Sequence, residues 1–413
     1  MSEIYIAGVG MTPFGRLLQR SVYDMVGESV GQALKDAGCG TADIGCAYYG
    51  TQTNGPFQGQ TAIPGPIAMR RLGIDGIPVF TVENACAAGS SAFHLATLAL
   101  RAGSCDIALA VGAEKMHIPD RGKMFGAFNG SWDVSTIAQN RATLVAIGKG
   151  VEPPPGTESH KLYSEFMHVY AALCRYHMKS YGTTQRQIAA VAAKNHRHSV
   201  HNPLAQFRDP YTIEQVLASP PISYPLTRLM CAPISDGAAA VVLCNADGLK
   251  RLGGAGKRAV RVLASVVQTG STHRIDEPYK AVAHLAAIKA YEQAGVAPHD
   301  VDVAEVHDAS AMGEILNAEA LMLAPVGGGG PAAERGAFSI GGRIPVNPSG
   351  GLEAKGHPIG ATGLGQTHEL VTQLRGEAGK RQVANARIAI QENGGGHYGI
   401  EEAVVVVNVL AKR

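Results

Sequence analysis

The chain has 413 residues, more than one ordinary core holds, so its length predicts two domains or one large composite. Hydrophobic residues make up 46% and charged residues 17%, which is typical of a soluble, well-packed protein. The formal net charge of +2 gives no electrostatic support for binding nucleic acid or a membrane surface. No apolar run approaches the roughly 20 residues of a membrane span, and the first residues lack a signal peptide's basic start, so export is not expected.

The seven cysteines are too scattered for a disulfide framework. Their number is odd, and the sequence contains no C-x-x-C pair of the kind that binds zinc. This usage favours a reducing, cytoplasmic setting in which most cysteines are small core residues. The cysteines are Cys39, Cys46, Cys86, Cys105, Cys174, Cys231 and Cys244.

Strand-like and helix-like patterns alternate along the chain. Short apolar runs predict strands at residues 4–10, 107–113, 238–244, 388–394 and 403–410. Helical patterns separate these runs. The alternation predicts an α/β protein in which sheets and helices form layers.

Two segments of the chain are alike. Val30–Gly50 aligns without a gap on Ala287–His307, 257 positions later. Both consist of an amphipathic helix, a glycine stop, an acidic turn and a strand. Residues 93–112 and 366–394 also share a helix-then-strand order. Duplicated units of this kind usually pack about a pseudo-twofold axis.

We therefore expect two homologous halves, residues 1–255 and 256–413, with an insert in the first half. The insert covers about residues 114–229 and has no counterpart in the second half. It contains a proline-rich loop, a helix expected over about 159–181, and an irregular histidine-rich stretch over 194–211. Irregular segments on a regular scaffold are more often lids or binding loops than core.

The stretch VENACAAGSS places Cys86 between a strand-like run and a helical pattern. A thiol at a helix N-terminus feels the positive end of the helix dipole, which favours the nucleophilic thiolate. The small neighbours allow a sharp turn, and the Cys86 N–H would be free to donate to an oxyanion. The context favours a nucleophile, while a buried core cysteine stays open as the alternative.

The stretch NPSGGLEAKGHPIGATG sets His357 among five glycines. A core histidine rarely needs such surroundings, so the pattern favours a histidine held on a tight loop as the partner base of a thiol. The rival interpretation is a phosphate-binding loop, but the stretch lacks the Gly-Lys-Ser/Thr ending that grips phosphate and magnesium.

These motifs resemble those of thiolases. VENACAAGSSAFHLA, EVHDAS, NPSGGLEAKGHPIGATG and a closing glycine-rich strand follow one another in the order found in that family. SDGAAAVVL and KNHRHSVHNPLAQF are similar to the sterol-carrier-protein and archaeal acetyl-CoA acetyltransferase branch. The resemblance covers nearly the whole chain. It implies the thiolase fold, with two α-β-α-β-α halves stacked as a five-layer αβαβα sandwich and an inserted loop domain over a coenzyme A tunnel.

The resemblance also implies a role for each site residue. Cys86 would take the acyl group from an acyl-CoA, and His357 would activate its thiol. His307, in EVHDAS, stands where the family has a residue that orients an oxyanion-binding water. Gly395, in ENGGGHYG, would donate its N–H together with that of Cys86 at a second oxyanion site. Coenzyme A would be a substrate, and no permanently bound cofactor and no metal are expected.

Two departures from the family pattern concern acid–base chemistry. Many thiolases carry a second cysteine in a C-x-G motif, and alignment puts Asn393 in that position, or Glu392 if the register shifts by one. Other relatives carry this cysteine after His-Asp, where this chain has Ala309 followed by Ser310. The group that moves the proton at the acetyl carbon is therefore unassigned. The candidates, in order of preference, are His307, then Glu392 and His397.

Three other features carry less weight. IAGVGMTPFG resembles a dinucleotide-binding loop but lacks the third glycine and a helix directly after it. A group of three histidines has no zinc-site spacing and favours a polar loop face; these are His196, His198 and His201. The basic residues of the insert would either meet coenzyme A phosphates or be scattered surface charge; these are Lys194, Arg197 and Arg208.

The sequence thus predicts an acyl-CoA acyltransferase that cleaves a 3-oxoacyl-CoA with coenzyme A or runs the reverse Claisen condensation. Two alternatives stay open: a thiolase-fold carbon–carbon lyase of the retro-aldolase type, and a non-catalytic thiolase-like subunit. Several relatives in this branch work with a small OB-fold protein carrying a zinc ribbon, so the resemblance implies such a partner beside a homodimer or a dimer of dimers. The small Ala309 and Ser310 would leave room for a bulky acyl group.

Overall fold

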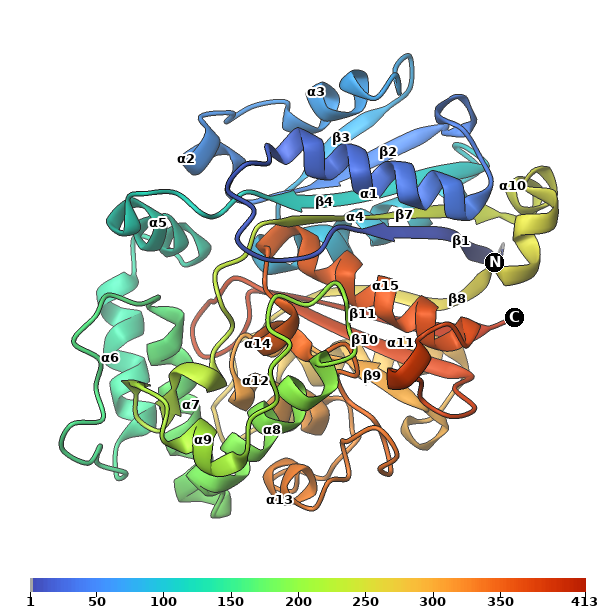
Figure 1. Ribbon diagram of the computed structural model, residues 1–413. Coiled ribbons are helices and arrows are strands. Elements are labelled where there is room, and N and C mark those ends of the chain that lie inside the picture. The colour runs from blue at the N-terminus through green and yellow to red at the C-terminus, as the bar shows by residue number, and fades with distance from the viewer. Residues whose placement is uncertain (1–2) are drawn as a thin grey trace.

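The computed structural model describes residues 3–413, in which nine strands form one mixed sheet covered by helices (Figure 1). The strand order across the sheet is β3-β2-β4-β7-β1-β8-β11-β10-β9. The five strands predicted from apolar runs are all present, as β1, β4, β7, β10 and β11. The strands of this sheet are β1 (Ile4–Met11), β2 (Cys46–Gly50), β3 (Val79–Val82), β4 (Ile107–Glu114), β7 (Gly237–Asn245), β8 (Val260–Thr269), β9 (Val303–Glu305), β10 (Ile388–Gly395) and β11 (Val404–Lys412).

The sheet consists of two half-sheets that repeat the same pairing. In the first half, β2 runs parallel to β4, β4 antiparallel to β7, and β7 antiparallel to β1. In the second half, β9, β10, β11 and β8 repeat this order and these directions. The half-sheets meet where Ile4–Ile6 of β1 pairs antiparallel with residues 260–262 of β8. The duplication expected from the sequence is therefore present in the hydrogen-bonding pattern.

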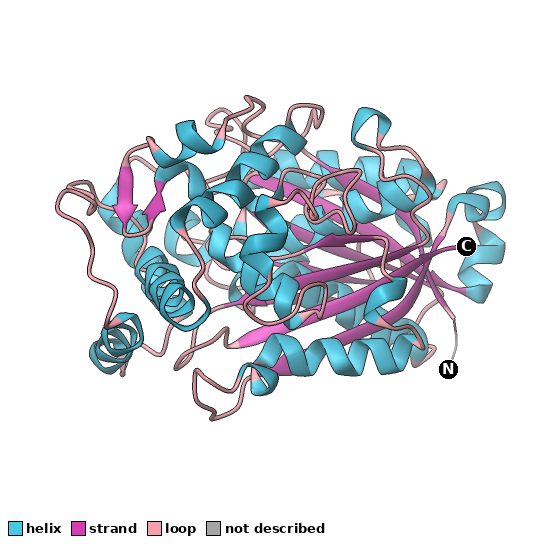
Figure 2. Ribbon diagram, turned by 90° about the horizontal axis from the view of Figure 1, so that it is seen from below, coloured by secondary structure: helices cyan, strands magenta, loops and turns pink. Residues whose placement is uncertain are grey.

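Helices complete five layers, which are stacked in Figure 1. Figure 2 looks at this stack from below, so that helices overlie the strands. Helices α4 and α15 lie between the half-sheets, and each contacts strands of both. Helix α1 covers the outer face of the first half-sheet on β1, β4 and β7, and α11 covers β8 and β11 of the second. This arrangement confirms the expected α/β class and layering. The helices of the two halves are α1 (Val22–Ala37), α2 (Asn54–Gln58), α3 (Pro64–Arg71), α4 (Ala88–Arg101), α10 (Ala246–Arg251), α11 (Val282–Ala294), α12 (Ala311–Ala320), α13 (Gly329–Glu334), α14 (Gly351–Lys355) and α15 (Thr362–Arg375).

The repeated sequence segments have the same local structure in both halves. Helix α1 ends at Gly38 with φ 67° and ψ 32°, and α11 ends at Gly295 with φ 68° and ψ 33°. This left-handed conformation favours glycine because it lacks a Cβ atom. In the turn that follows, Asp43 and Asp300 each accept a hydrogen bond from the backbone N–H three residues upstream, at 2.9 and 2.8 Å. In both halves, therefore, the glycine ends the helix and the aspartate stabilises the turn that follows it.

The first half carries a long connection between β4 and β7, residues 115–236, whereas residues 396–403 suffice between β10 and β11. Its helix α7 begins at Phe166, later than expected. The histidine-rich stretch that was expected to be irregular begins inside helix α8, which a Thr184–Gln187 capping box starts. The elements of this connection are α5 (Arg121–Phe128), α6 (Ile137–Gly148), α7 (Phe166–Tyr181), α8 (Gln185–Ser199), α9 (Ile213–Leu217), β5 (Pro221–Ser223) and β6 (Leu226–Thr227).

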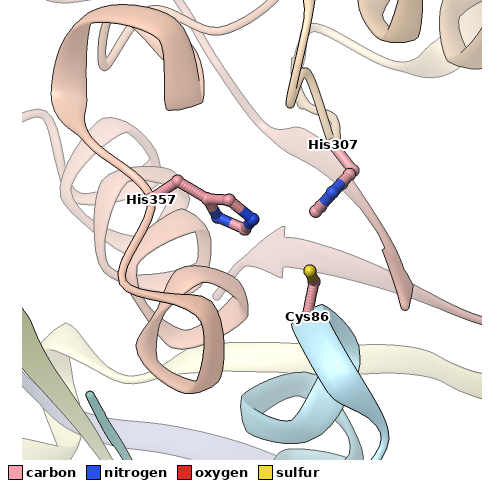
Figure 3. A group of neighbouring side chains, drawn as sticks. All are labelled: Cys86, His307 and His357. Carbon is pink, nitrogen blue, oxygen red and sulfur yellow. The ribbon is translucent and has the colours of Figure 1, made fainter. Parts of the chain in front are cut away.

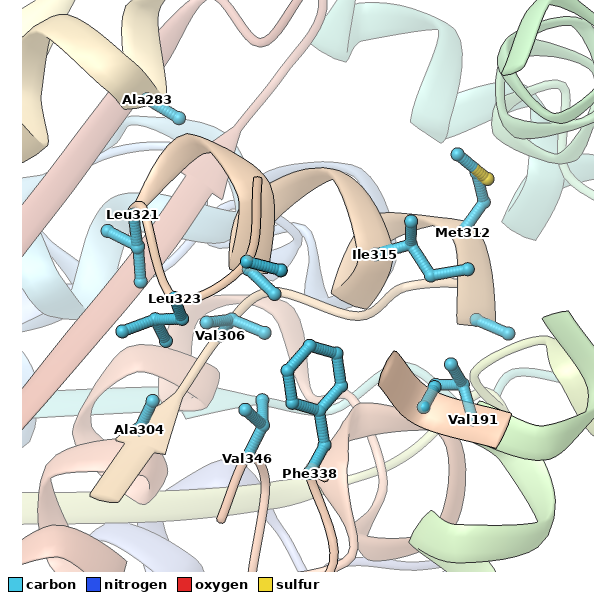
Figure 4. Packing of buried hydrophobic residues seen from close by; sticks show 14 of the residues in the cluster. Val191, Ala283, Ala304, Val306, Met312, Ile315, Leu321, Leu323, Phe338 and Val346 are labelled. Carbon is cyan, nitrogen blue, oxygen red and sulfur yellow. The ribbon is translucent and has the colours of Figure 1, made fainter. Parts of the chain in front are cut away.

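A large apolar cluster joins this connection to the second half (Figure 4). Val191 of α8 packs in it with Met312 and Ile315 of α12 and with Phe338, all of them buried. Burying such side chains contributes about 1.5–3 kcal/mol each. The insert is thus part of a core shared with the second half. No helix within residues 3–413 is both long and apolar enough to cross a membrane.

Candidate functional site

Cys86 lies on a sharp turn between β3 and α4. Residues 85–87 form a 3-10 turn, and Ala85, directly before the cysteine, has φ 48°. A non-glycine residue in this region costs about 1–3 kcal/mol and persists only where its surroundings hold it. Here the Ala85 N–H donates to the Glu83 carboxylate at 2.6 Å. The expected bend is present, and the strained residue is an alanine.

Three side chains from distant parts of the chain converge at this turn (Figure 3). The Cys86 Sγ atom and one ring nitrogen each of His307 and His357 all lie within 4.8 Å of one another. The two imidazole rings have centroids 5.1 Å apart and planes at 79°. A thiol and two imidazoles are ligands that zinc accepts, so among the described residues this is the group that could hold a metal ion.

His357 is oriented as a base. Its Nδ1 atom is 2.7 Å from the Thr362 hydroxyl oxygen, and that hydroxyl donates to the Pro358 carbonyl at 3.2 Å. Since the hydroxyl has a single proton, it accepts from His357 Nδ1–H, and the lone pair lies on Nε2. Burial, with smaller contributions from His307 and Lys355, holds the pKa of His357 well below its usual value. The ring is therefore neutral at pH 7 and able to accept a proton.

The loop before His357 requires glycine at one clear position. Gly356 has φ 110°, and a Cβ atom there would lie 2.8 Å from the Ser235 hydroxyl oxygen. That hydroxyl accepts the His357 backbone N–H at 2.9 Å. The close approach holds the histidine backbone against the segment that leads into β7.

His307 follows β9 and is 3% exposed. Its backbone N–H donates to the Glu392 carboxylate at 2.9 Å, and its Nδ1 atom lies 3.0 Å from Asn393 Nδ2. Burial lowers the pKa of His307 to about 4, so the ring is neutral at pH 7. Asn393 is fully buried behind this ring and does not line the cavity.

The protonation state of Cys86 differs from the sequence-based expectation. Burial, followed by the charges of Glu114 and Glu83, raises the pKa of the Cys86 thiol to about 12. The dipole of α4 favours the thiolate, but burial disfavours any charge, and in this structure burial dominates. The resting thiol is neutral, and its proton has to leave during the attack.

Gly395 packs against the turn that carries Cys86. A Cβ atom at this position would lie 2.2 Å from the Asn84 carbonyl oxygen and 2.8 Å from the Ala87 nitrogen. Only glycine allows β10 to approach the turn so closely. Because side chains alternate along a strand, Asn393 and Gly395 belong to the same face of β10. The structure thus brings together all five predicted residues, with Asn393 behind His307 and the other four at the cavity.

A cavity extends from these residues toward the insert and α11. Along one face of α7, Tyr170, Leu173 and His177 line it, and α12 contributes Leu316 and Ala320. The α7 residues are spaced three and four apart, which is the helical spacing that could have marked them in the sequence. The wall as a whole is largely apolar.

The structure changes the choice among acid–base candidates. Glu392 accepts the His307 backbone N–H and does not line the cavity. His397 lines it, with its ring 4.9 Å from that of Trp132. Glu402, which the sequence did not single out, also lines the cavity, and burial raises its pKa to about 6. A carboxyl group with this pKa can exchange a proton near neutral pH.

A buried polar network connects helix α8 to the loops that carry His307 and His357. Lys194 is 1% exposed, and its Nζ atom lies 2.9 Å from Glu314 and 2.6 Å from the Val346 carbonyl oxygen. The neighbouring Asn195 donates to Asp308 at 3.0 Å, directly after His307. Lys194 therefore cannot meet coenzyme A phosphates, which corrects one sequence-based interpretation.

The histidines near Lys194 also differ from expectation. His196 and His198 lie on α8 and are buried, so they do not form a polar loop face. The His196 ring packs edge-on against Tyr211, with centroids 5.0 Å apart, and His198 faces the Asn347 carbonyl at 3.0 Å. Burial lowers the pKa of His196 to about 4 and that of His198 to about 3. Both are neutral packing residues.

Solved structures with similar folds support the architecture. The Ltp2-ChsH2(DUF35) aldolase matches with a TM-score of 0.78 and 22% identity, covering 100% of this chain and 98% of that chain. Human mitochondrial 3-ketoacyl-CoA thiolase matches with a TM-score of 0.68 and 15% identity, covering 100% and 99%. At these identities the likeness concerns the fold, and it confirms the predicted thiolase fold.

Sequence comparisons identify the family. The thiolase N-terminal domain model matches residues 4–216, and the thiolase C-terminal domain-like model matches residues 264–408. Acetyl-CoA acetyltransferase of Methanothermobacter thermautotrophicus is 39% identical over 97% of this chain and 98% of its own length. Sterol carrier protein 2 of Homo sapiens is 38% identical over 98% and 71%. Benzoylsuccinyl-CoA thiolase subunit BbsB of Thauera aromatica is 34% identical over 95% of each chain. The chain therefore belongs to the thiolase family.

Proposed function

We propose that this protein is an acyl-CoA acyltransferase that cleaves a 3-oxoacyl-CoA with coenzyme A, or runs the reverse Claisen condensation, through an acyl thioester on Cys86. The observation that carries this proposal is the convergence of the Cys86 thiol with His357 and His307 at the wall of one cavity. The names of the acetyltransferase and thiolase relatives support the reaction class.

In the cleavage direction, Cys86 Sγ attacks the 3-keto carbon while His357 Nε2 accepts the thiol proton. This order of events follows from the raised pKa of the thiol and the neutral imidazole. The carbon–sulfur bond forms, the bond between carbons 2 and 3 breaks, and the acetyl-CoA carbanion takes up a proton. Coenzyme A then attacks the acyl-enzyme, its thiol proton replaces the one given to the carbanion, and the His357 imidazolium returns its proton to Cys86 as the thiolate leaves.

Negative charge develops on an oxygen in both steps, so preset donors are required. We assign one donor to His307 Nε2–H and the second site to the backbone N–H groups of Cys86 and Gly395. The Cys86 N–H stands at the start of a helical turn, where N–H groups have no partner inside the helix. For the proton at the acetyl carbon we replace His307, the first choice from the sequence, by Glu402.

Intact-protein mass spectrometry after mixing with an acyl-CoA panel tests the proposal. An adduct of the acyl mass is expected on the wild type and is expected to be absent from Cys86→Ala. A lyase of the retro-aldolase type or a non-catalytic subunit would show no acyl adduct with any acyl-CoA. In that case, turnover of a 3-hydroxyacyl-CoA to an aldehyde or ketone would identify the lyase.

The acyl group is proposed to be bulky and apolar. Ala309 lines the cavity, and the α7 residues Tyr170 and Leu173 offer apolar surface beyond it. Ser310 is fully buried outside the wall and adds no room to the cavity. A higher kcat/KM for bulky than for short 3-oxoacyl-CoAs is expected, and a strict preference for acetoacetyl-CoA would contradict it.

Assembly and location stay proposals. We propose a homodimer, or a dimer of dimers, and a small OB-fold protein with a zinc ribbon as a further subunit. The Ltp2-ChsH2(DUF35) structure, named as a two-protein aldolase, is compatible with such a partner. Full activity of a partner-free preparation would contradict dependence on it. We propose a cytoplasmic setting on the basis of cysteine usage alone.

A further inference from the structure

The side chain of Asn393 lies between two polar groups inside the protein. Its Nδ2 atom is 3.0 Å from Nδ1 of His307, and its Oδ1 atom is 2.7 Å from the Ser90 hydroxyl oxygen. Both Ser90 and Asn393 are fully buried. Which end of the amide faces which neighbour decides where His307 carries its proton.

Ser90 determines the orientation of this amide. In the described part of the chain, the Ser90 hydroxyl contacts two side chains, Asn393 and Gln391. Gln391 presents its nitrogen to Ser90 at 3.0 Å, because the same nitrogen donates to the Gly363 carbonyl at 2.6 Å. An amide nitrogen accepts no hydrogen bond, so the buried hydroxyl proton goes to Asn393 Oδ1. The Nδ2 group of Asn393 then faces His307.

Glycine at position 363 makes this contact possible. A Cβ atom on Gly363 would lie 1.9 Å from the Ser90 hydroxyl oxygen and 2.4 Å from Asn393 Oδ1. Any side chain at this position of α15 would displace both groups. The contact is thus built from three elements that meet only in the folded chain: α4, α15 and β10.

We infer that Asn393 is a positioning residue that holds His307 as the Nε2–H tautomer, a fixed hydrogen-bond donor toward the reacting carbonyl oxygen. An amide N–H can only donate, so His307 Nδ1 accepts and the ring proton lies on Nε2. The catalytic use of this donor rests on the proposed function. The assignment of the His307 tautomer does not depend on that function.

This assignment explains what occupies the position where many relatives carry a second cysteine. Asn393 is shielded from the cavity by the His307 ring, so it cannot exchange a proton with a substrate carbon. It also removes His307 from the candidate bases, because Nδ1 is engaged by Asn393 and Nε2 already carries the proton. At position 393, an acid–base cysteine of many relatives is thus replaced by an asparagine that orients the hydrogen-bond donor His307.

The first experiment reads the tautomer directly. Selective 15N labelling of histidine, with His307→Gln to identify the resonances, reports which ring nitrogen carries the proton. We expect an unprotonated Nδ1 and a protonated Nε2 in the ligand-free wild type. A protonated Nδ1 would overturn the inference, whatever the enzyme does with acyl-CoA.

The second experiment changes the donor without changing the size of the side chain. In Asn393→Asp, studied at a pH at which the new carboxyl is ionised, both oxygens accept, so the His307 proton is expected to move to Nδ1 and the donor to be lost. Loss of one oxyanion donor lowers kcat by about 10²–10³-fold, with a much smaller change in KM. Asn385→Asp, the same change at an exposed residue, serves as the control.

The outcomes separate the two proposals. An unchanged tautomer in Asn393→Asp, or a moved tautomer with an unchanged rate, would overturn the positioning role. Thermal melting of each variant checks that it is folded, and the NMR readout holds for any folded variant. If the wild type has the expected tautomer but forms no acyl adduct on Cys86, the proposed function fails while the assignment of the tautomer stands.

Discussion

Glu402 precedes β11 and lines the cavity together with Cys86 and His357. A Cβ atom on Gly394 would lie 3.0 Å from its Oε1 atom, so the carboxyl group sits beside the strand that supports the turn of Cys86. Burial, with a smaller contribution from Glu401, raises the pKa of Glu402 from its usual 4.5 to about 6. Below this pH the folded protein carries a neutral acid at the cavity wall.

We expect Glu402→Gln to slow 3-oxoacyl-CoA cleavage by about 10²-fold, the usual contribution of a general acid. Protonation of the carbanion needs the neutral acid, so the wild-type rate falls as the pH rises through about 6, and the variant lacks this limb. Acylation of Cys86 by a saturated acyl-CoA moves no carbon-bound proton and is expected to be unchanged. Rates from pH 5 to 8 check this, and an unaltered pH profile would rule out Glu402 as the acid.

At the scale of elements, α8 is the part of the insert that supports the site. Its Lys194 and Asn195 reach Glu314 on α12 and Asp308 beside His307, inside the shared core. Burial and neighbouring carboxylates raise the pKa of Asp308 well above its usual value. The loop of His307 thus depends on hydrogen bonds from a helix that belongs to the other half of the sequence.

Lys194→Met is expected to destabilise the fold by about 3–5 kcal/mol, because it leaves the buried Glu314 without the positive charge that pairs with it. Urea unfolding measures the change. Arg197→Met, three positions along the same helix and exposed, is the control and is expected to stay within about 0.5 kcal/mol. A raised KM for coenzyme A without loss of stability in the Lys194 variant would instead support a role in substrate binding.

At the scale of the whole molecule, the sheet ends at β3, which among the described residues has β2 as its only neighbour strand. Phe80 on this strand is 53% exposed, and its ring stacks on Tyr48 with centroids 5.6 Å apart. An exposed apolar edge strand is a template for pairing with another chain. The proposed homodimer would cover this edge with its own copy.

Phe80→Asp is therefore expected to shift the protein from dimer to monomer, because it places a charge in an apolar contact. Light scattering coupled to size exclusion at micromolar concentration measures the molar mass. Val145→Asp, on α6 and 72% exposed, is the control and is expected to stay dimeric. A dimeric Phe80 variant would place the interface on another surface.

The sequence by itself determined the elements and their duplication. Glycine stops at Gly38 and Gly295, acidic turns at Asp43 and Asp300, and the apolar runs of the strands act over a few residues. Such local signals survive in the folded protein, because backbone conformation at these positions depends mainly on near neighbours. The glycines around His357 belong to another class, because a Cβ atom on Gly356 or Gly363 would meet Ser235 or Ser90, which are far away in the sequence.

Only the tertiary structure decided the chemistry of these residues. Burial raises the pKa of the Cys86 thiol, Lys194 is buried against Glu314, and Asn393 lies between Ser90 and His307. Each of these facts depends on groups that are far apart in the sequence, and on burial, which is a property of the packed interior. The identity of a residue sets which protons it can hold, and its neighbours in space decide which of them it keeps.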